Sequence, residues 1–205
     1  MSQSTKIVPT ADYSRPIELI MECHRRVEHF WTVLMNIASL RGATLNDDQR
    51  ESLRTGLDYF LSAIPRHTED EEISMFSRML QTGDPRVHAV MEEIKQLESE
   101  HDAVRSMHDR VDELGRRWLD CGSLGSEDAD EWASLVSELQ QAYNEHIKVE
   151  DGLVFPVAAE VLDRDALDLM GKEMAARRAA NPGRAGSRCA ERRLKEAAAR
   201  GELDG

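Results

Sequence analysis

Four stretches of this sequence repeat apolar residues at steps of three and four, the spacing of one face of an α-helix. Runs of Val, Ile, Thr and Tyr that are typical of strands are missing, and aromatic residues make up only 5%. The sequence therefore predicts an all-α fold. The four stretches run from Pro16 to near Gly42, Asn46 to Gly83, Asp84 to about Cys121, and Gly125 to about Pro156.

Capping residues and prolines predict where these helices begin. Ser14 is expected to cap the first helix, with Pro16 in the first turn, where its missing N–H group costs nothing. Asn46 is expected to cap the second helix, and Asp84 to open the third. Pro65 lies inside the second stretch. It is either a tolerated bend or a device that turns the next residues inward, and the sequence leaves both interpretations open.

Four long helices joined by short turns are expected to pack as an up-down antiparallel four-helix bundle with a C-terminal helical extension. We assign residues 14–162 to the bundle, after an N-terminal arm at residues 1–13. A short accessory helix is predicted at residues 163–180, followed by a basic flexible tail at residues 181–205. From residue 176 onward the chain has eight basic and four acidic residues. The tail could dock on its own acidic domain, bind another acidic surface or stay disordered.

Charge and cysteine content narrow the class of protein. The net charge of −13 argues against nucleic acid as the main partner. No apolar run approaches the ~20 residues that cross a bilayer, and no secretory signal is expected in residues 1–30. Cys23, Cys121 and Cys189 are odd in number and far apart, which favours a reducing, cytoplasmic setting without membrane association.

Two His-x-x-x-Glu pairs stand inside the helical stretches, His67 with Glu71 and His146 with Glu150. A four-residue spacing places both side chains of a pair on one face of a helix. Imidazole nitrogen and carboxylate oxygen both suit iron, manganese or zinc. One such pair is weak evidence, because either residue can simply face solvent, but two pairs together favour a metal site.

The antiparallel arrangement also predicts which residues lie at the same height. Counted from the turns at ~1.5 Å per residue, one histidine from each helix falls within about one helical turn of the others. The six residues expected in this layer are His24, His67, Glu71, His101, His146 and Glu150. Two buried carboxylates would each be costly unless a cation neutralised them. The sequence therefore predicts a metal centre in the core.

The number of ligands favours two ions over one. Four imidazoles and two bridging carboxylates supply about eight bonds, whereas one tetrahedral zinc ion needs only four. Two six-coordinate ions offer about twelve positions, less any shared oxygen. We expect a dinuclear centre with a solvent-derived bridge and at least one open position.

The order His, His-x-x-x-Glu, His, His-x-x-x-Glu, with one group per helix, resembles the hemerythrin-like (HHE) cation-binding family. The stretch from Glu145 to Pro156 also resembles that family, and the likeness extends over residues 16–161. The resemblance implies a four-helix bundle around two non-haem iron ions, oxo- or hydroxo-bridged. Zinc or manganese are also possible occupants, since raw affinity favours zinc over ferrous iron. The resemblance also implies that His24, His67, His101 and His146 are terminal ligands and that Glu71 and Glu150 are bridges.

The chain departs from the oxygen carriers of that family, which have a second histidine four residues after the one on the third helix. Arg105 occupies this position here. His108, seven residues after His101, lies too far along the axis to replace it. The ligand set is closer to that of iron–sulfur-cluster repair proteins and small bacterial members. The cysteine-bearing N-terminal domain of the repair proteins is absent, so repair activity is not expected. The missing histidine is expected to expose one iron.

Three functions remain open from the sequence. The protein could bind or sense a small ligand such as dioxygen, peroxide or nitric oxide, could catalyse peroxide decomposition or nitric oxide reduction, or could buffer iron. Arg105 could lie over the open position, or could point to Glu98 or to water as a structural ion pair. Tyr143 could donate a hydrogen bond or an electron to the centre, or could simply pack beside it. The physiological ligand, the reductant and the oligomeric state are not predicted.

Overall fold

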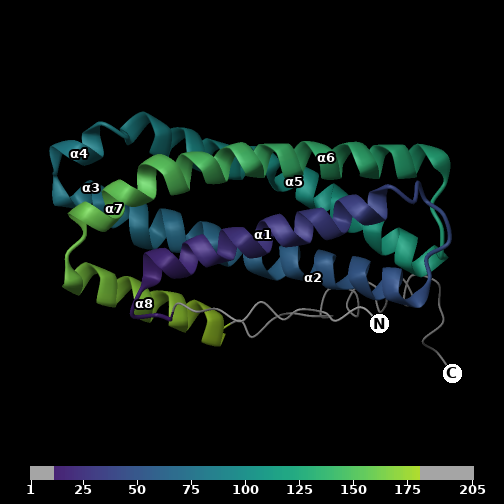
Figure 1. The fold of residues 1–205 in the computed structure, drawn as a ribbon, viewed down its shortest axis with the longest axis horizontal. Coiled ribbons are helices and arrows are strands. Elements are labelled where there is room, and N and C mark those ends of the chain that lie inside the picture. The colour runs from purple at the N-terminus through teal and green to yellow at the C-terminus, as the bar shows by residue number, and fades with distance from the viewer. Residues whose placement is uncertain (1–11, 181–205) are drawn as a thin grey trace, which may run out of the picture.

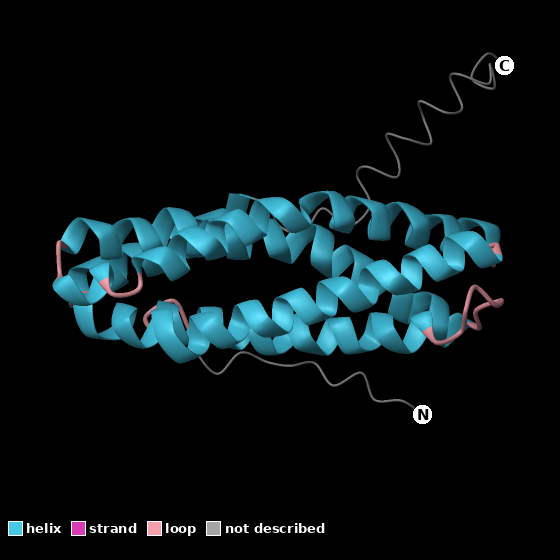
Figure 2. Cartoon of the chain, turned by 90° about the horizontal axis from the view of Figure 1, so that it is seen from above, coloured by secondary structure: helices cyan, strands magenta, loops and turns pink. Residues whose placement is uncertain are grey.

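The computed structural model describes residues 12–180, and every regular element in that range is helical (Figures 1 and 2). The predicted all-α class is therefore confirmed. The elements are α1 (Pro16–Ala38), α2 (Asp47–Glu69), η1 (Asp70–Phe76), α3 (Ser77–Thr82), α4 (Pro85–His88), α5 (Met91–Cys121), α6 (Ser126–Val149), η2 (Glu150–Val154), α7 (Phe155–Val161) and α8 (Arg164–Ala180). Here η1 and η2 are π-helical turns. The predicted tail at residues 181–205 and most of the predicted arm lie outside the described residues.

The four long helices α1, α2, α5 and α6 lie side by side along the long axis of the molecule (Figures 1 and 2). Each contacts two of the others, because α1 packs against α2 and α6, and α5 packs against the same two helices. The short helices α3, α4 and α7 gather at one end (Figure 1). Helix α8 lies against α1 and η1 near that end.

Two apolar clusters fill the interior, one towards each end of the long helices. The first contains Trp31, Trp118 and Trp132, all almost fully buried. The second is built around Phe76 and Phe155 and includes residues of α3, α4, α7 and α8. Because the first cluster begins at Val27 of α1 and the second ends at Ile20, the helix turn between them carries His24.

Several predicted helix ends are confirmed. The side chain of Asn46 accepts a hydrogen bond from the backbone of Gln49, whose own side chain accepts one from the backbone of Asn46. Gly83 and Gly122 follow α3 and α5 with φ angles of 64° and 83°, a left-handed conformation that glycine adopts without strain. The prediction for Ser14 is wrong, because its hydroxyl donates to Asp12 and Arg15 precedes α1 without a side-chain cap.

The helices are also less continuous than predicted. Asp84 and Pro85 open only the short α4, and the chain breaks at Ala89 and Val90 before α5 begins. The second and fourth predicted helices are each interrupted by a π-helical turn, whereas α2 continues through Pro65. Among the described helices none is both long and apolar enough to span a bilayer.

Candidate metal centre

The six residues predicted for the core layer come together in the structure. They form two groups that share both carboxylates, His24 and His67 with Glu71 and Glu150, and His101 and His146 with the same two. Within each group the possible ligand atoms lie within 4.8 Å of one another. The donors come from α1, α2, η1, α5, α6 and η2, so all four long helices contribute.

Each carboxylate faces both groups. Glu71 places Oε1 3.0 Å from Nε2 of His67 and Oε2 3.6 Å from Nε2 of His101. Glu150 places Oε2 3.2 Å from Nε2 of His24 and Oε1 3.2 Å from Nε2 of His146. A carboxylate whose two oxygens point to different histidine pairs has the geometry of a bridge between two ions.

The unsatisfied polar atoms of the interior concentrate here. Both oxygens of Glu71, both oxygens of Glu150 and Nε2 of His146 are buried without a hydrogen-bond partner. Across residues 12–180 the same is true of only one other side-chain atom, the indole nitrogen of Trp31. Since buried polar groups are normally paired, five orphaned ligand atoms around one point fit a site that holds cations.

Three of the four histidines are oriented by a carboxylate on the opposite ring nitrogen. Nδ1 of His24 lies 2.9 Å from Asp151, Nδ1 of His101 lies 2.8 Å from Glu72, and Nδ1 of His146 lies 2.8 Å from Glu100. An ionised carboxylate only accepts hydrogen bonds, so the proton of each neutral ring is on Nδ1. The Nε2 lone pairs of these three rings therefore face the centre, where Nε2 of His24 also lies 3.1 Å from Nε2 of His67. A ring protonated on Nδ1 is the tautomer that metal ligation through Nε2 requires.

Without a cation, the buried carboxylates and imidazoles of the centre shift one another's pKa values. Burial, together with the charge of Glu150, raises the pKa of Glu71 to about 7. Burial opposes the charge on Glu150 as well, but the imidazoles of His146 and His24 hold its pKa well below the usual range. Burial would lower the pKa of His146, yet Glu150 and Glu100 raise it to about 9. Positive ions between the carboxylates would remove this competition for protons.

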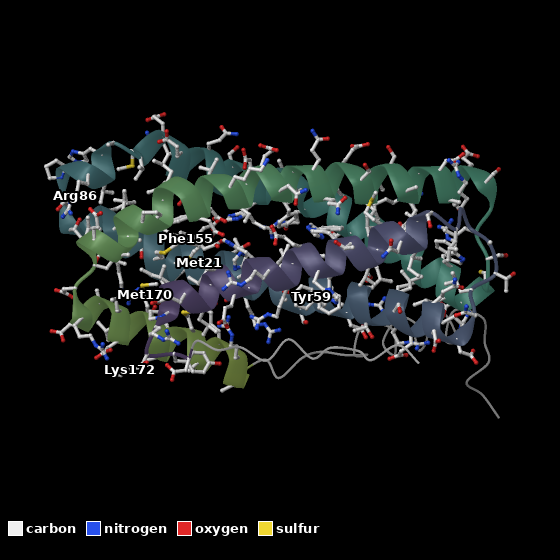
Figure 3. The ribbon with its side chains drawn as sticks, in the orientation of Figure 1. Met21, Tyr59, Arg86, Phe155, Met170 and Lys172 are labelled. Atoms are coloured by element: carbon white, nitrogen blue, oxygen red, sulfur yellow. The ribbon has the colours of Figure 1, made fainter. Side chains whose placement is uncertain are left out.

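The two halves of the centre repeat one sequence pattern. His67 to Phe76 and His146 to Phe155 both read His-x-x-x-Glu, then an acidic residue, three further residues and Phe. In both, the Glu lies in a π-helical turn. The wider turn reduces the angle between successive side chains, so Glu71 and Glu150 face the centre while their neighbours reach a histidine of another helix. Phe155, labelled in Figure 3, stacks on His24 according to the 5.4 Å separation of their ring centroids and the 20° angle between their planes.

Sequence reasoning missed the three orienting carboxylates, although a signal was present. Glu72 and Asp151 directly follow the two predicted bridging residues, and Glu100 directly precedes His101. A carboxylate beside a ligand residue can orient a histidine ring. In an α-helix, however, successive side chains point about 100° apart, so Glu72 and Asp151 would be expected to point away from the site.

The two other predicted residues have different surroundings from the six. The guanidinium of Arg105 is mostly exposed and pairs with Asp102 at 3.0 Å on its own helix rather than with Glu98, which agrees with the surface ion pair among its two interpretations. The residue also lines one of the two cavities described below that reach His101. Tyr143 is buried, and its hydroxyl lies 2.9 Å from Nε2 of His108, whose pKa is lowered to about 4 by burial. Its ring centroid lies 6.3 Å from that of His146.

Two cavities approach the half of the centre that contains His101. One, of about 700 Å³, lies between α5 and α6 and is lined by both His101 and His146. The other, of about 480 Å³, lies between α2 and α5 and is lined by His101, His108 and Tyr143. His24, in contrast, is only 1% exposed. The structure therefore offers a small molecule a route to one half of the site.

Comparison with known proteins supports the resemblance seen in the sequence. Residues 15–158 match the family described as hemerythrin HHE cation binding domain. A protein of Haemophilus influenzae, described as uncharacterized, is 30% identical over 174 residues, which cover 82% of this chain and 92% of that protein.

Proposed function

Because this chain belongs to the hemerythrin HHE cation-binding family, we propose that it binds two iron ions and reacts with or senses a small ligand. His24 and His67 would hold one ion, His101 and His146 the other, with Glu71 and Glu150 bridging them. The five buried ligand atoms without a hydrogen-bond partner are the observation that carries this proposal. A set of imidazoles and carboxylates suits iron, and also zinc or manganese.

We propose that the fold holding this centre is the up-down four-helix bundle predicted from the sequence. The contacts of α1 and α5 with α2 and α6 support it. In such a bundle, ligands from facing helices meet in the core without any change of backbone course. We also propose a cytoplasmic setting, which is supported by the separated cysteines.

The open positions would lie on the ion held by His101 and His146, since both cavities lead there. Iron in such a site supplies redox chemistry and affinity for dioxygen, peroxide or nitric oxide. The chain itself would orient the imidazoles through Glu72 and Glu100 and would exclude bulk water with its apolar walls. These contributions are common to a sensor, an enzyme and an iron buffer.

A redox enzyme is the second candidate, and the surroundings of Tyr143 favour it. Its hydroxyl faces His108, which burial keeps neutral at pH 7 and able to accept a proton. A buried phenol with a proton acceptor is suited to giving up an electron near an oxidising centre. Decomposition of peroxide or reduction of nitric oxide would then be the reactions to test.

Metal analysis of the purified protein, with optical spectra before and after exposure to peroxide, dioxygen and nitric oxide, tests the proposal. We expect two ions per chain and spectra that respond to at least one of the three ligands. Catalytic turnover would identify an enzyme, whereas a single binding event would identify a sensor. A protein that binds fewer than one ion per chain under iron-replete conditions would contradict the proposal.

Two neighbouring substitutions on α5 give a matched test of the ligand set. His101→Ala is expected to lower the iron content, because it removes a ligand from the accessible ion. Arg105→Ala is expected to leave the iron content unchanged, because its guanidinium pairs with Asp102 on the surface. Iron per chain, measured side by side, checks both. Equal iron in His101→Ala and the parent would exclude His101 as a ligand.

A further inference from the structure

The π-helical turn η1 contains two polar residues that are fully buried and that do not face the metal centre. Asp70 and Ser74 both have no exposed surface, and Asp70 directly precedes Glu71. An ionised carboxylate is not buried in a protein interior unless other groups pair with it. The partners of Asp70 therefore bear on where the neighbouring Glu71 can lie.

Helix α8 supplies these partners. Nη1 of Arg177 and Nη2 of Arg178 each lie 2.7 Å from a different carboxylate oxygen of Asp70. Arg177 also donates to the hydroxyl of Ser74 at 2.6 Å, and Ser74 donates in turn to Glu173 at 2.5 Å. Both oxygens of Asp70 are thus held by charged groups from an element about 100 residues away.

The equivalent turn in the other half of the centre has no such polar pair. In the repeated pattern, Asp70 corresponds to Val149 and Ser74 corresponds to Leu153. A π-helical turn that presents a bridging carboxylate can therefore be built with apolar residues at both places. The polar pair marks the turn on which α8 lies.

Close apolar packing holds the rest of α8 in place. Met170 and Met174 are fully buried, and Figure 3 shows Met170 on the side of α8 nearest α1, with the exposed Lys172 on the outer side. At Gly171 an added Cβ atom would lie 1.9 Å from the carbonyl oxygen of Tyr13. The helix can therefore approach the segment before α1 only because residue 171 is glycine.

We propose that α8 is a positioning element for the metal centre, which fixes η1 and hence Glu71 through Arg177 and Arg178. The proposal rests on the metal-binding function proposed above. Docking of α8 and metal binding would then favour each other to the same degree, because coupling between two binding events is reciprocal. Whatever releases α8 from η1 would loosen the ions, and loading the ions would tighten α8.

The first test compares two variants of α8 in the full chain. In the Arg177→Ala/Arg178→Ala double variant, Asp70 loses both partners, and we expect ferrous ion, measured anaerobically by calorimetry, to bind about 10–100-fold more weakly. Arg164→Ala is the control, because Arg164 is exposed and, among the described residues, pairs with Asp168 of its own helix at 3.0 Å. Affinity equal to that of the parent in the double variant would overturn the proposal.

Gly171→Val supplies a second variant that leaves every charge in place. It should displace α8 by steric contact with Tyr13 and weaken ferrous binding in the same direction. If it undocks α8 without changing the affinity, the arginine effect is local electrostatics and the proposal fails. The Arg177→Lys/Arg178→Lys variant should recover part of the affinity, because the charges return without the paired geometry of guanidinium.

Amide hydrogen exchange tests the reciprocal effect. We expect metal to slow exchange in α8 of the parent by a factor similar to the loss of affinity, and to slow it less in the double variant. Residues 126–140 of α6, at the far end of the molecule, report any general stabilisation. Protection of α6 and α8 to equal extents in both proteins would overturn the proposal. A parent that binds no iron would instead refute the proposed function.

Discussion

Three carboxylates, Glu72, Glu100 and Asp151, decide which nitrogen of each neighbouring histidine carries the proton. This is a property of single residues, because each bond joins one side chain to one ring. Partners of this kind raise the basicity of a ligand and fix the plane of its ring. The accessible half of the centre has two of them, on His101 and His146.

Glu100→Gln should therefore weaken binding of the ion that we propose for His101 and His146. The neutral amide can still accept a hydrogen bond from Nδ1 of His146, but it lacks the negative charge that raises the basicity of the ring. We therefore expect an affinity loss of about 10-fold or more for one of the two ions. Stepwise metal titration measures it. Glu92→Gln is the control on the same helix, because Glu92 is exposed and pairs with Lys95. A loss of equal size in both variants would point to net charge instead.

The metal-free protein should lose stability as the pH rises from 6.5 to 9. Folding raises the pKa of His146 from 6.5 to about 9. The protonated ring therefore contributes its full stabilisation of the folded state below pH 6.5, and this stabilisation is lost as the pH rises towards 9 and the folded protein loses the proton. We expect a loss on the order of 2 kcal/mol. Thermal unfolding at several pH values in chelator checks it. His146→Gln should flatten the slope, and an unchanged slope would assign the effect elsewhere.

At this scale the sequence predicts the positions of the six inward residues well. Their spacing places each on the buried face of a helix, and the heights of His24, His67, His101 and His146 follow from the turn positions. The surroundings of Arg105 and Tyr143 could not be predicted, because a long side chain near a helix surface chooses among several partners. In the structure, Arg105 donates a hydrogen bond to Asp102, and the hydroxyl of Tyr143 is hydrogen-bonded to His108.

The π-helical turns are the elements that distinguish this centre from an ordinary helix pair. In η2 the hydrogen bonds span one residue more than in an α-helix, so Glu150 and Asp151 can serve the same site from adjacent positions. Gly152 lies in this turn, and an added Cβ atom there would meet no other atom within 4 Å. The turn therefore has no steric need for glycine.

Deleting Gly152 should close η2 into an α-helical turn and rotate Asp151 away from His24. We expect helix content by circular dichroism to stay the same while metal affinity falls about 10-fold or more. Gly152→Ala is the matched control, since it keeps the length and should stabilise the helix by about 0.5–1 kcal/mol. Full affinity in the deletion variant would show that the π turn is dispensable.

Helix ends with local signals could be predicted, and interruptions with tertiary causes could not. Asn46, Gly83 and Gly122 act through their own backbone conformations and hydrogen bonds. The break at Ala89 and Val90 could not be predicted, because neither residue is a proline or a glycine and both are compatible with a helix. Likewise nothing in the hydrophobic spacing separates a π turn from an α-helix over so few residues.

On the scale of the whole molecule, the centre lies between the two apolar clusters and joins all four long helices. Its loading should therefore affect global unfolding. Each ion at ~100 times its Kd adds about 2.7 kcal/mol, so two ions should raise Tm by on the order of 10 °C. Differential scanning calorimetry with and without chelator measures the shift.

The Glu71→Gln/Glu150→Gln variant should lack this shift. A neutral amide at both positions leaves no anionic group to bridge two cations, so the variant should unfold at the same temperature with and without chelator. A chelator-dependent Tm in this variant would mean that the ions bind elsewhere.

The all-α class follows from periodicity, but the place of α8 does not. Its apolar spacing predicts a short helix at residues 163–180, where the structure has α8 at Arg164–Ala180. Its docking depends instead on the Asp70 contacts and on the close approach at Gly171. Such contacts join residues far apart in sequence, and no local pattern encodes them.

The two halves of the centre differ in how deeply they lie, with His24 almost fully enclosed and His101 reached by two cavities. The two ions should accordingly exchange with the surroundings on different timescales. Protein briefly treated with a chelator would then retain its inner ion, and a second metal added afterwards would give a mixed pair in a defined order. Isotope labelling could assign each spectral feature to one half.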